Sequence, residues 1–290
     1  MASATTTVSI PAPRERHDGL LRESVAPLVR ELANLPALDA VYFDRVNKPD
    51  WGLRIRIHSG DSDLHEDARR LVRRRLESTG QPFAFVDDEA EDKWFGGPAE
   101  EAFLKRIHHA DSAACLDLLD LEARAALSTS RAQWSLLAVE GLLDLFGIHG
   151  ALRLDFYRRG FEWAPALGRW DAEVFAVLEA KFEAQAGALR DAIALSADRH
   201  RPDVWGGTEA ALIAGGFLAA ARAPVSVALE AASSGGLEKA PIDVALFLAH
   251  AHSNRLGIHA TQEATIRYLI FRARGGESLQ AQPGGPASSS

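Results

Sequence analysis

Two arginines on one predicted strand are spaced so that they could act together in binding or catalysis. Arg54 and Arg56 stand two apart in the sequence GLRIRI, so they project from the same face of a strand, while Leu53, Ile55 and Ile57 enter the core. Two neighbouring guanidiniums repel each other, and an anion or a carboxylate-bearing ligand above them would relieve that repulsion. A solvated sheet face, on which arginines pair with nearby acids, explains the same pattern, so both interpretations stay open.

Histidine is the second residue type that could do chemistry, because it moves protons near neutral pH. His250 and His252 lie two apart on a predicted helix, so they point in different directions and do not suit one metal ion. His108 and His109 are adjacent and are equally poor partners. A histidine that is simply hydrogen-bonded in the core or at the surface accounts for each of them. No spacing typical of zinc, phosphate loops or dinucleotide binding is present, so we expect no metal and no cofactor.

A Gly-Gly step in the segment EDKWFGGPAEEAF indicates a loop that turns into a helix. Lys93 and Trp94 come just before it, Pro98 suits the first helical turn, and Glu100 and Glu101 favour the positive end of a helix. The pattern on its own predicts a helix start and is weak evidence for a ligand.

The elements that must position these residues belong to a chain of globular composition. Its 290 residues are 47% hydrophobic, and its net charge of −8 lacks the basic excess of a nucleic-acid surface. The single cysteine, Cys115, cannot form an internal disulfide and lies in a helical apolar pattern, which predicts a buried side chain and a cytoplasmic protein. We find neither a signal sequence nor a run of about 18 apolar residues, so no membrane span is expected.

The hydrophobic pattern predicts an α+β fold, with an N-terminal helix and a small antiparallel sheet followed by a mainly helical lobe. Residues 17–35 have helical spacing, 40–46 and 52–58 form a predicted hairpin, and 62–80 and 82–89 add a helix and a strand. Further helices are predicted over residues 99–127, 130–146, 169–197, 208–221, 242–256 and 261–274, whereas 150–159 fits either a helix or a strand.

We interpret residues 17–274 as a single domain with two lobes, 17–98 and 99–274. Residues 1–16 are predicted to be a flexible N-terminus. The last residues, 275–290, are rich in Gly, Pro, Gln and Ser and are predicted to be a disordered tail.

These segments, in this order, resemble the elimination domain of class I lantibiotic dehydratases and their thiopeptide relatives. That family has an aromatic-rich strand ending in Arg, a short loop and a strand of the form H-L-R-L-R. The segment VYFDRVNKPDWGLRIR matches it with Arg45, Arg54 and Arg56.

The later blocks of the family follow at matching places. Its E-x-x-R-Y-G-G segment corresponds to EDKWFGG, and its helical Asp-Ser pair corresponds to Asp111 and Ser112. Its H-M-x-x-N-R-L segment corresponds to HAHSNRL, where His250, Asn254, Arg255 and Leu256 match. The resemblance therefore extends over residues 40–256.

The resemblance implies a reaction. Full-length members attach glutamate from glutamyl-tRNA to Ser or Thr of a precursor peptide, and the elimination domain removes it to leave a dehydroamino acid. The developing enolate needs hydrogen-bond donors, and the leaving carboxylates suit arginines. The resemblance thus implies leaving-group and oxyanion recognition by Arg54 and Arg56, with His250 as acid/base. It implies a substrate-binding role for Arg45, Lys93, Trp94, Asn254 and Arg255.

Two positions depart from the family pattern and leave three hypotheses. Trp94 stands where the family has Arg, with Lys93 beside it, and Gly52 replaces the His at the head of the arginine strand. In the first hypothesis, the chain is an elimination subunit that works with a separate glutamylating enzyme. In the second, it is a pyridine synthase that joins two dehydroalanines in a [4+2] cycloaddition with leader-peptide loss. In the third, it is a non-catalytic peptide-binding scaffold. In all three the partner is a precursor peptide. No direct nucleic-acid contact is expected, and a homodimer is compatible with each.

Overall fold

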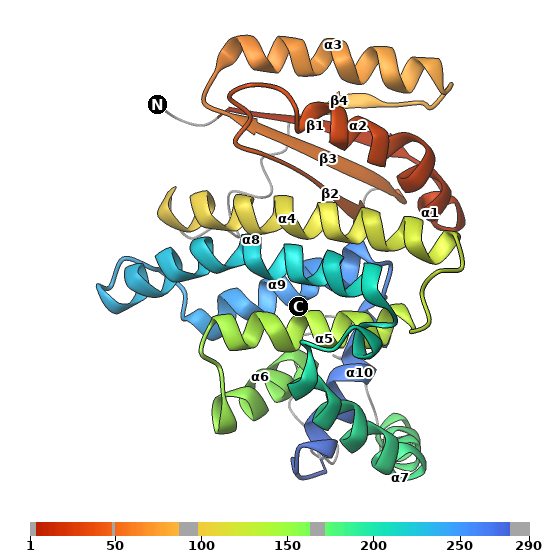
Figure 1. The fold of residues 1–290 in the computed structure, drawn as a ribbon, viewed down its shortest axis with the longest axis vertical. Helices are drawn as coiled ribbons and strands as arrows, with labels where there is room; N and C mark the ends of the chain where they lie inside the picture. Colours follow the sequence, from red (N-terminus) through yellow and green to blue (C-terminus); the bar gives the residue numbers. More distant parts are fainter. Residues whose placement is uncertain (1–3, 48–49, 87–97, 163–171, 279–290) are drawn as a thin grey trace, which may run out of the picture.

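A four-stranded antiparallel sheet forms the N-terminal part of the molecule, with the strand order β2-β3-β1-β4 (Figure 1). The computed structural model describes residues 4–47, 50–86, 98–162 and 172–278. The strands are β1 (Ala4–Pro11), β2 (Ala40–Val46), β3 (Gly52–Ser59) and β4 (Ala84–Val86). The predicted hairpin of β2 and β3 is confirmed, and the predicted third strand is the short edge strand β4.

The N-terminus is not flexible as predicted, because β1 lies in the middle of the sheet. It pairs with β3 along its whole length and with β4 on its other side. The alternation of Thr6, Val8 and Ile10 explains this, since Val8 and Ile10 are buried in the core that the helices form beneath the sheet. The first 16 residues thus contribute a strand to the fold.

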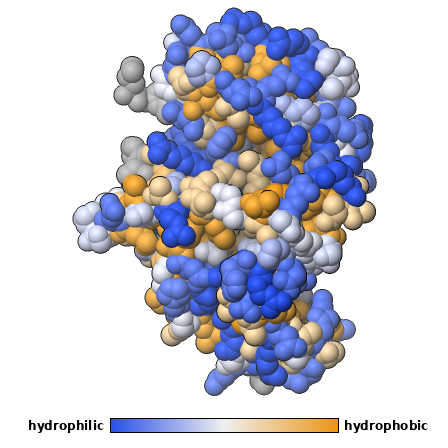
Figure 2. Space-filling model, viewed as in Figure 1, coloured by the Kyte–Doolittle hydropathy of each residue, from blue (hydrophilic) through white to orange (hydrophobic). Residues whose placement is uncertain are grey.

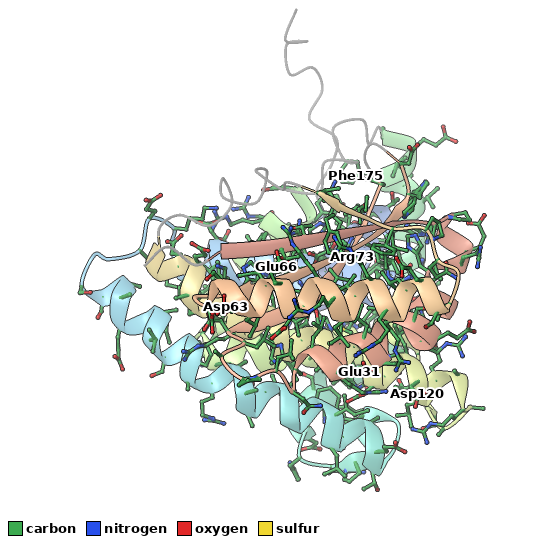
Figure 3. All side chains as sticks on the ribbon, turned by 90° about the horizontal axis from the view of Figure 1, so that it is seen from above. Glu31, Asp63, Glu66, Arg73, Asp120 and Phe175 are labelled. Atoms are coloured by element: carbon green, nitrogen blue, oxygen red, sulfur yellow. The ribbon has the colours of Figure 1, made fainter. Side chains whose placement is uncertain are left out.

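Two helical segments pack on the apolar face of this sheet, which carries Val8, Ile10, Ile55 and Ile57. The first runs from α1 (His17–Leu20) through a π-helical turn (Leu21–Val25) into α2 (Ala26–Leu32), and the next is α3 (Ser62–Ser78), whose N-terminus is capped by the Asp61 side chain. Seen from above, α3 lies over the sheet and runs roughly along its strands (Figure 3). Leu53, Ile55 and Ile57 are fully buried, as predicted.

The second lobe is helical, as predicted, and its first helix packs on β2. Residues 150–159, which fitted either type of element, lie in a helix. The helices are α4 (Pro98–Ala123), α5 (Arg131–Leu145), α6 (Gly150–Glu162), α7 (Ala172–Leu195), α8 (Thr208–Ser233), α9 (Pro241–Arg255) and α10 (Ala260–Ala273), with 3-10 turns at Arg14–Arg16, Ser196–Asp198 and Pro202–Trp205.

Helix α8 extends well beyond its predicted end at residue 221 and contains Pro224 in its interior. Proline in a helix interior costs about 3 kcal/mol, but here Pro224, Val225 and Ala228 are buried against neighbouring helices, which offsets that cost. By length and composition alone, α8 is also the one helix of the described chain that could cross a membrane. Its outer face carries the exposed Leu212 and Val227, and Figure 2 shows apolar surface over the middle of the molecule, where α8 lies.

The C-terminal segment begins with ordered contacts rather than with the predicted disorder. The carbonyl of Gly276 accepts a hydrogen bond from Arg272, and the hydroxyl of Ser278 donates to Glu179 at 2.9 Å. Residues 279–290 lie outside the described part of the chain.

Candidate active site

A cleft of about 420 Å³ opens where the sheet lobe meets the helical lobe. Three chain segments build it: the turn before α1, the end of β2 with the loop that follows, and α9 with the turn into α10. The lining residues are Arg14, His17, Arg45, Asn47, Trp51, His250, Asn254, Gly257, Ile258, His259 and Ala260. A second hollow shares Arg14, Asn47, His259 and Ala260 and extends towards Lys181. Of the site residues expected from sequence, the cleft brings together Arg45, His250 and Asn254.

His250 lies on the wall of this cleft, with a carboxylate behind it. Its side chain is 33% exposed, and its Nδ1 lies 2.7 Å from Oε2 of Glu263 on α10. Glu263 is itself buried and forms an ion pair with the buried guanidinium of Arg267. The cleft therefore contains an imidazole that can exchange protons and whose orientation is fixed by a carboxylate.

The two arginines of the cleft differ in their contacts. Arg45 is nearly buried: its guanidinium donates to Asp18 at 2.7 Å and to the Arg255 carbonyl at 3.0 Å. Arg14 is exposed, and its guanidinium lies 5.8 Å from the ring centroid of Trp51. Arg14 can thus turn towards a negatively charged ligand, while Arg45 supplies a fixed positive charge in the wall.

Arg54 and Arg56 do share a face of β3, as their spacing predicted. The register places Asp44 of β2 opposite Arg54, and the guanidinium of Arg56 donates to Asp44 at 2.5 Å. Arg56 is 5% exposed and Arg54 is half-buried. This face of β3 is therefore largely buried, unlike the solvated face of the first interpretation. Arg56 is paired with Asp44, unlike the two unpaired guanidiniums of the second interpretation. The described residues that line the cleft do not include Arg54 or Arg56.

Arg255 connects α9 to this sheet face and to α4. It is fully buried, and its Nη2 donates to Asp44 at 2.9 Å while its Nη1 donates to Asp111 at 2.7 Å. Burial alone would lower the pKa of Arg255, but the two carboxylates outweigh it and raise that pKa. For Asp44 and Asp111, burial would raise the pKa, and the neighbouring positive groups instead hold it below its usual range.

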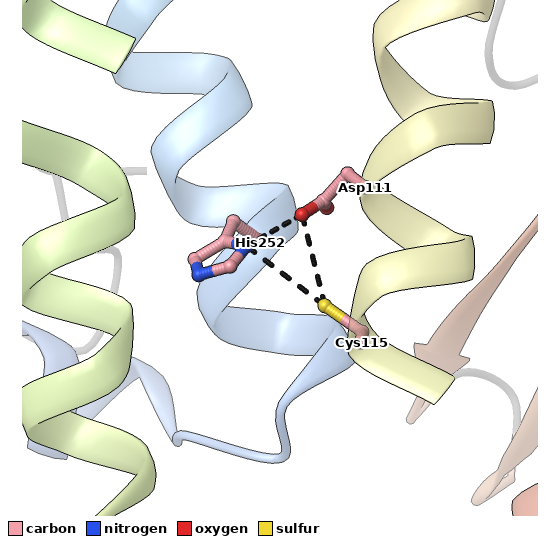
Figure 4. A group of neighbouring side chains, drawn as sticks. All are labelled: Asp111, Cys115 and His252. Atoms are coloured by element: carbon pink, nitrogen blue, oxygen red, sulfur yellow. Dashed lines mark hydrogen bonds and ion pairs between the residues drawn. The ribbon is translucent and has the colours of Figure 1, made fainter. Parts of the chain in front are cut away.

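A second histidine lies on the buried side of α9. His252 Nδ1 lies 2.5 Å from Asp111 (Figure 4). The imidazole also stacks on the rings of Trp134 and Phe217. Cys115 lies 3.8 Å from the same nitrogen, and burial, followed by the charge of Asp111, raises the pKa of its thiol well above the usual value. His250 and His252 thus point in different directions, and Cys115 is buried, as predicted.

Asp111, Cys115 and His252 also form the group of described residues whose ligand atoms could surround a metal ion, all within 4.8 Å of one another. Sequence spacing could not reveal this group, because its members lie on α4 and α9. The guanidinium of Arg255 already neutralises Asp111, so a second cation beside it would be repelled. The cluster is therefore explained as a buried ionic and aromatic contact between α4 and α9.

The remaining site residues expected from sequence have other positions. Lys93 and Trp94 lie outside the described residues. Asn254 and Arg255, which were expected to bind substrate, use their side chains on the backbone and carboxylates of β2. Sequence reasoning missed Glu263 and Arg14. The spacing of Glu263 and Arg267, four residues apart on a helix, was the available signal for the first.

Comparison with known proteins identifies a family model and solved structures that resemble this chain. Residues 6–274 match the family model described as lantibiotic biosynthesis dehydratase C-term. A search of curated proteins finds no match.

Solved structures share the fold at low sequence identity. The tRNA-dependent lantibiotic dehydratase MibB from Microbispora sp. 107891 is 19% identical with a TM-score of 0.64; the match covers 93% of this chain but 28% of MibB. TsrL is 19% identical with a TM-score of 0.68, and 94% of each chain is covered. TbtD, a pyridine synthase from thiomuracin biosynthesis, is 14% identical with a TM-score of 0.67, and the match covers 93% of this chain and 97% of TbtD.

Proposed function

The chain belongs to the family of lantibiotic dehydratase C-terminal domains, and we propose that it tailors a ribosomally made precursor peptide by β-elimination of glutamate from glutamylated Ser or Thr. The observation that carries this proposal is the position of His250, on the wall of a cleft that also holds Arg14 and Arg45. A base, a fixed positive charge and an adaptable arginine around one space suit the removal of a proton and of a carboxylate leaving group.

The reaction can be written on these residues. His250 takes the Cα proton of the modified residue, and the electron pair forms the Cα–Cβ double bond. The Cβ–O bond of the same side chain breaks, and glutamate departs as a carboxylate with the electron pair of that Cβ–O bond. In this proposal Arg14 contacts the departing glutamate, and the peptide follows the cleft and the adjoining hollow towards Lys181.

Arg54 and Arg56 keep a supporting role in the proposal. Their charges lie on the covered face of β3 next to Asp44, which Arg255 of α9 also contacts. Neither side chain is among the described residues that line the cleft, so in this proposal they act through the β2–β3 contacts that position the cleft and not by touching the substrate. Arg45 and Asn254 hold the end of β2 at the cleft.

A second candidate function is supported by the length match with TbtD. That pyridine synthase is covered over 97% of its length, whereas MibB is covered over 28%. In this second proposal the chain joins two dehydroalanines in a [4+2] cycloaddition and releases the leader peptide. Acid/base assistance by His250 is less central to that bond formation, so the His250 cleft favours elimination.

The experiment that separates these functions offers two peptides to the purified protein and follows each by mass spectrometry. One peptide carries a glutamylated Ser, and the other carries two dehydroalanines. The proposal predicts loss of glutamic acid from the first peptide and no change in the second. Cyclisation of the second peptide alone would establish the pyridine synthase, and binding without turnover of either would indicate a scaffold. In each case a cytoplasmic precursor peptide is the partner, and elimination also requires a separate glutamylating enzyme.

A further inference from the structure

We propose that Glu263 is the positioning residue of the cleft, and that it fixes the tautomer of His250 with Arg267 as its counter-charge. This inference rests on the proposed function for its role in the reaction, but its structural part can be tested without any substrate. His250 lines the cleft, while the buried Glu263 and Arg267 line a second, smaller hollow of about 30 Å³.

The fold brings the two elements of this contact together through one tight turn. Helix α9 ends at Arg255 and α10 begins at Ala260, and Gly257 between them has a φ of +76°, which a residue with a side chain rarely adopts. The turn places Glu263 next to His250, so that Oε2 lies 2.7 Å from Nδ1. The carboxylate is 7% exposed, against 33% for the imidazole, so the contact is shielded from water on the carboxylate side.

The contact decides which nitrogen of His250 can act as a base. A carboxylate accepts a hydrogen bond and cannot donate one, so Nδ1 keeps its proton in the neutral imidazole. Nε2 is then the nitrogen that gains and loses a proton. When Nε2 takes a proton, the positive charge that develops on the ring lies beside Glu263, which stabilises it.

Arg267 offsets the cost of burying the Glu263 carboxylate, because the two side chains form an ion pair. It lies one helical turn after Glu263 and is 5% exposed. Burial lowers the pKa of its guanidinium, and the charge of Glu263 works in the opposite direction. The guanidinium also lies 5.5 Å from the ring centroid of Phe156, in space that a side chain at Gly160 would occupy. The arrangement therefore holds the carboxylate at the imidazole by charge pairing and by packing.

The test is nitrogen NMR of the histidine side chains, with the His250 signal assigned from a His250→Gln spectrum. Glu263→Leu is combined with Arg267→Met, because the single change would leave a buried guanidinium unpaired. Glu263→Gln keeps an oxygen acceptor for Nδ1–H without the charge. Glu179→Gln, which removes a carboxylate from the Arg272 and Tyr268 contacts on α7 and α10, is the control for a general loss of packing.

The parent protein, Glu263→Gln and Glu179→Gln are expected to show His250 protonated at Nδ1, and the Leu/Met double variant is expected to lose that preference. Elimination of glutamate should slow roughly 10-fold to 100-fold in the double variant, mainly in kcat, and less in Glu263→Gln. An unchanged His250 tautomer in the double variant would overturn the inference, as would a changed tautomer with an unchanged rate. If His250→Ala itself eliminates glutamate at the parent rate, the proposed function fails, while the tautomer result still decides the structural part.

Discussion

The side-chain amide of Asn254 forms two hydrogen bonds with the backbone of Arg45. Its Oδ1 accepts from the Arg45 N–H and its Nδ2 donates to the Arg45 carbonyl, both at 2.9 Å. Asn254 thus occupies the outer edge of β2 in the way that a neighbouring strand would. Ser112 of α4 contacts the same edge two residues earlier, where its Oγ accepts one hydrogen bond from the Phe43 N–H at 3.1 Å. The edge of the sheet is therefore closed by α4 and α9, and these contacts fix the cleft between the lobes.

Replacing Asn254 with Ala should destabilise the protein by about 1–3 kcal/mol, because two half-buried backbone groups of Arg45 lose their partner. Asn254→Asp should be intermediate, since a carboxylate still accepts from the N–H but cannot donate to the carbonyl. Urea unfolding measures both. Asn34→Ala, which removes an exposed bond to the Arg30 carbonyl, is the control and should have little effect. Equal losses for Asn254→Ala and Asn34→Ala would contradict the account of the β2 edge.

The helices and strands of this fold could be predicted from the sequence better than the contacts between them. Period-two alternation located β2 and β3 and the shared face of Arg54 and Arg56, because it depends only on neighbouring residues. It also existed in β1, where Val8 and Ile10 alternate with Thr7 and Ser9, although residues 1–16 were predicted to be flexible. The outer contacts of β2 could not be predicted, because Arg45 and Asn254 are 209 residues apart in the sequence.

The same limit applies to the candidate site. The two-residue spacing of His250 and His252 correctly indicated that they point in different directions. Which of them faces a cleft depends on where Glu263 and Asp111 lie, and both come from other helices. The resemblance to a family matched Arg255 without indicating that it is fully buried between two carboxylates. Its role in holding β2, α4 and α9 together follows from the structure.

Arg255→Lys should be among the most destabilising conservative changes in the chain, with a loss of about 3–5 kcal/mol. A lysine ammonium cannot reach the Phe43 carbonyl, Asp44 and Asp111 at once, so at least one buried carboxylate is left unpaired. Chemical unfolding of Arg255→Lys and of Arg30→Lys, which alters an exposed pair with Asp117, provides the comparison. A similar stability for both variants would show that the buried network contributes little.

Two buried histidines should make the protein less stable in mild acid. Burial is the largest cause that lowers the pKa of His58, to about 2, and of His108, to about 3, from an ordinary value of 6.5. Below pH 6.5 the unfolded chain therefore binds protons that the folded chain does not, and the free energy of unfolding falls with falling pH. Each group contributes up to roughly 1.4 kcal/mol per pH unit.

Asp44 and Asp111 contribute little between pH 6.5 and 4.5, because their pKa values lie below the ordinary 3.8. Burial also lowers the pKa of His17, which adds to the loss of stability in this window. Urea unfolding across this window should give a smaller slope for His58→Gln than for the parent. His58 bonds Thr5 and Tyr42, so the variant is also expected to lose some stability at pH 7. A parent protein whose stability does not change between pH 6.5 and 4.5 would contradict the prediction.

Cys115 should be chemically inert in the folded protein. Its side chain is fully buried, and burial raises the pKa of its thiol, so the reactive thiolate is scarce. A colourimetric thiol reagent at pH 8 is expected to label no cysteine in the native protein and one in urea. Rapid labelling of the native protein would mean that the α4–α9 contact opens readily, and would return Cys115 to the candidates for chemistry.

The central claim is that the cleft at His250 carries out elimination, and the rate of glutamate loss from a glutamylated peptide tests it most directly. Single-turnover reactions of the parent, His250→Ala and His149→Ala are followed by mass spectrometry; His149 is an exposed histidine beside Asp144 and serves as the matched control. The account predicts that the parent and His149→Ala release glutamate at similar rates, while His250→Ala is slower by about 100-fold or more. Release by His250→Ala at the parent rate would contradict the account.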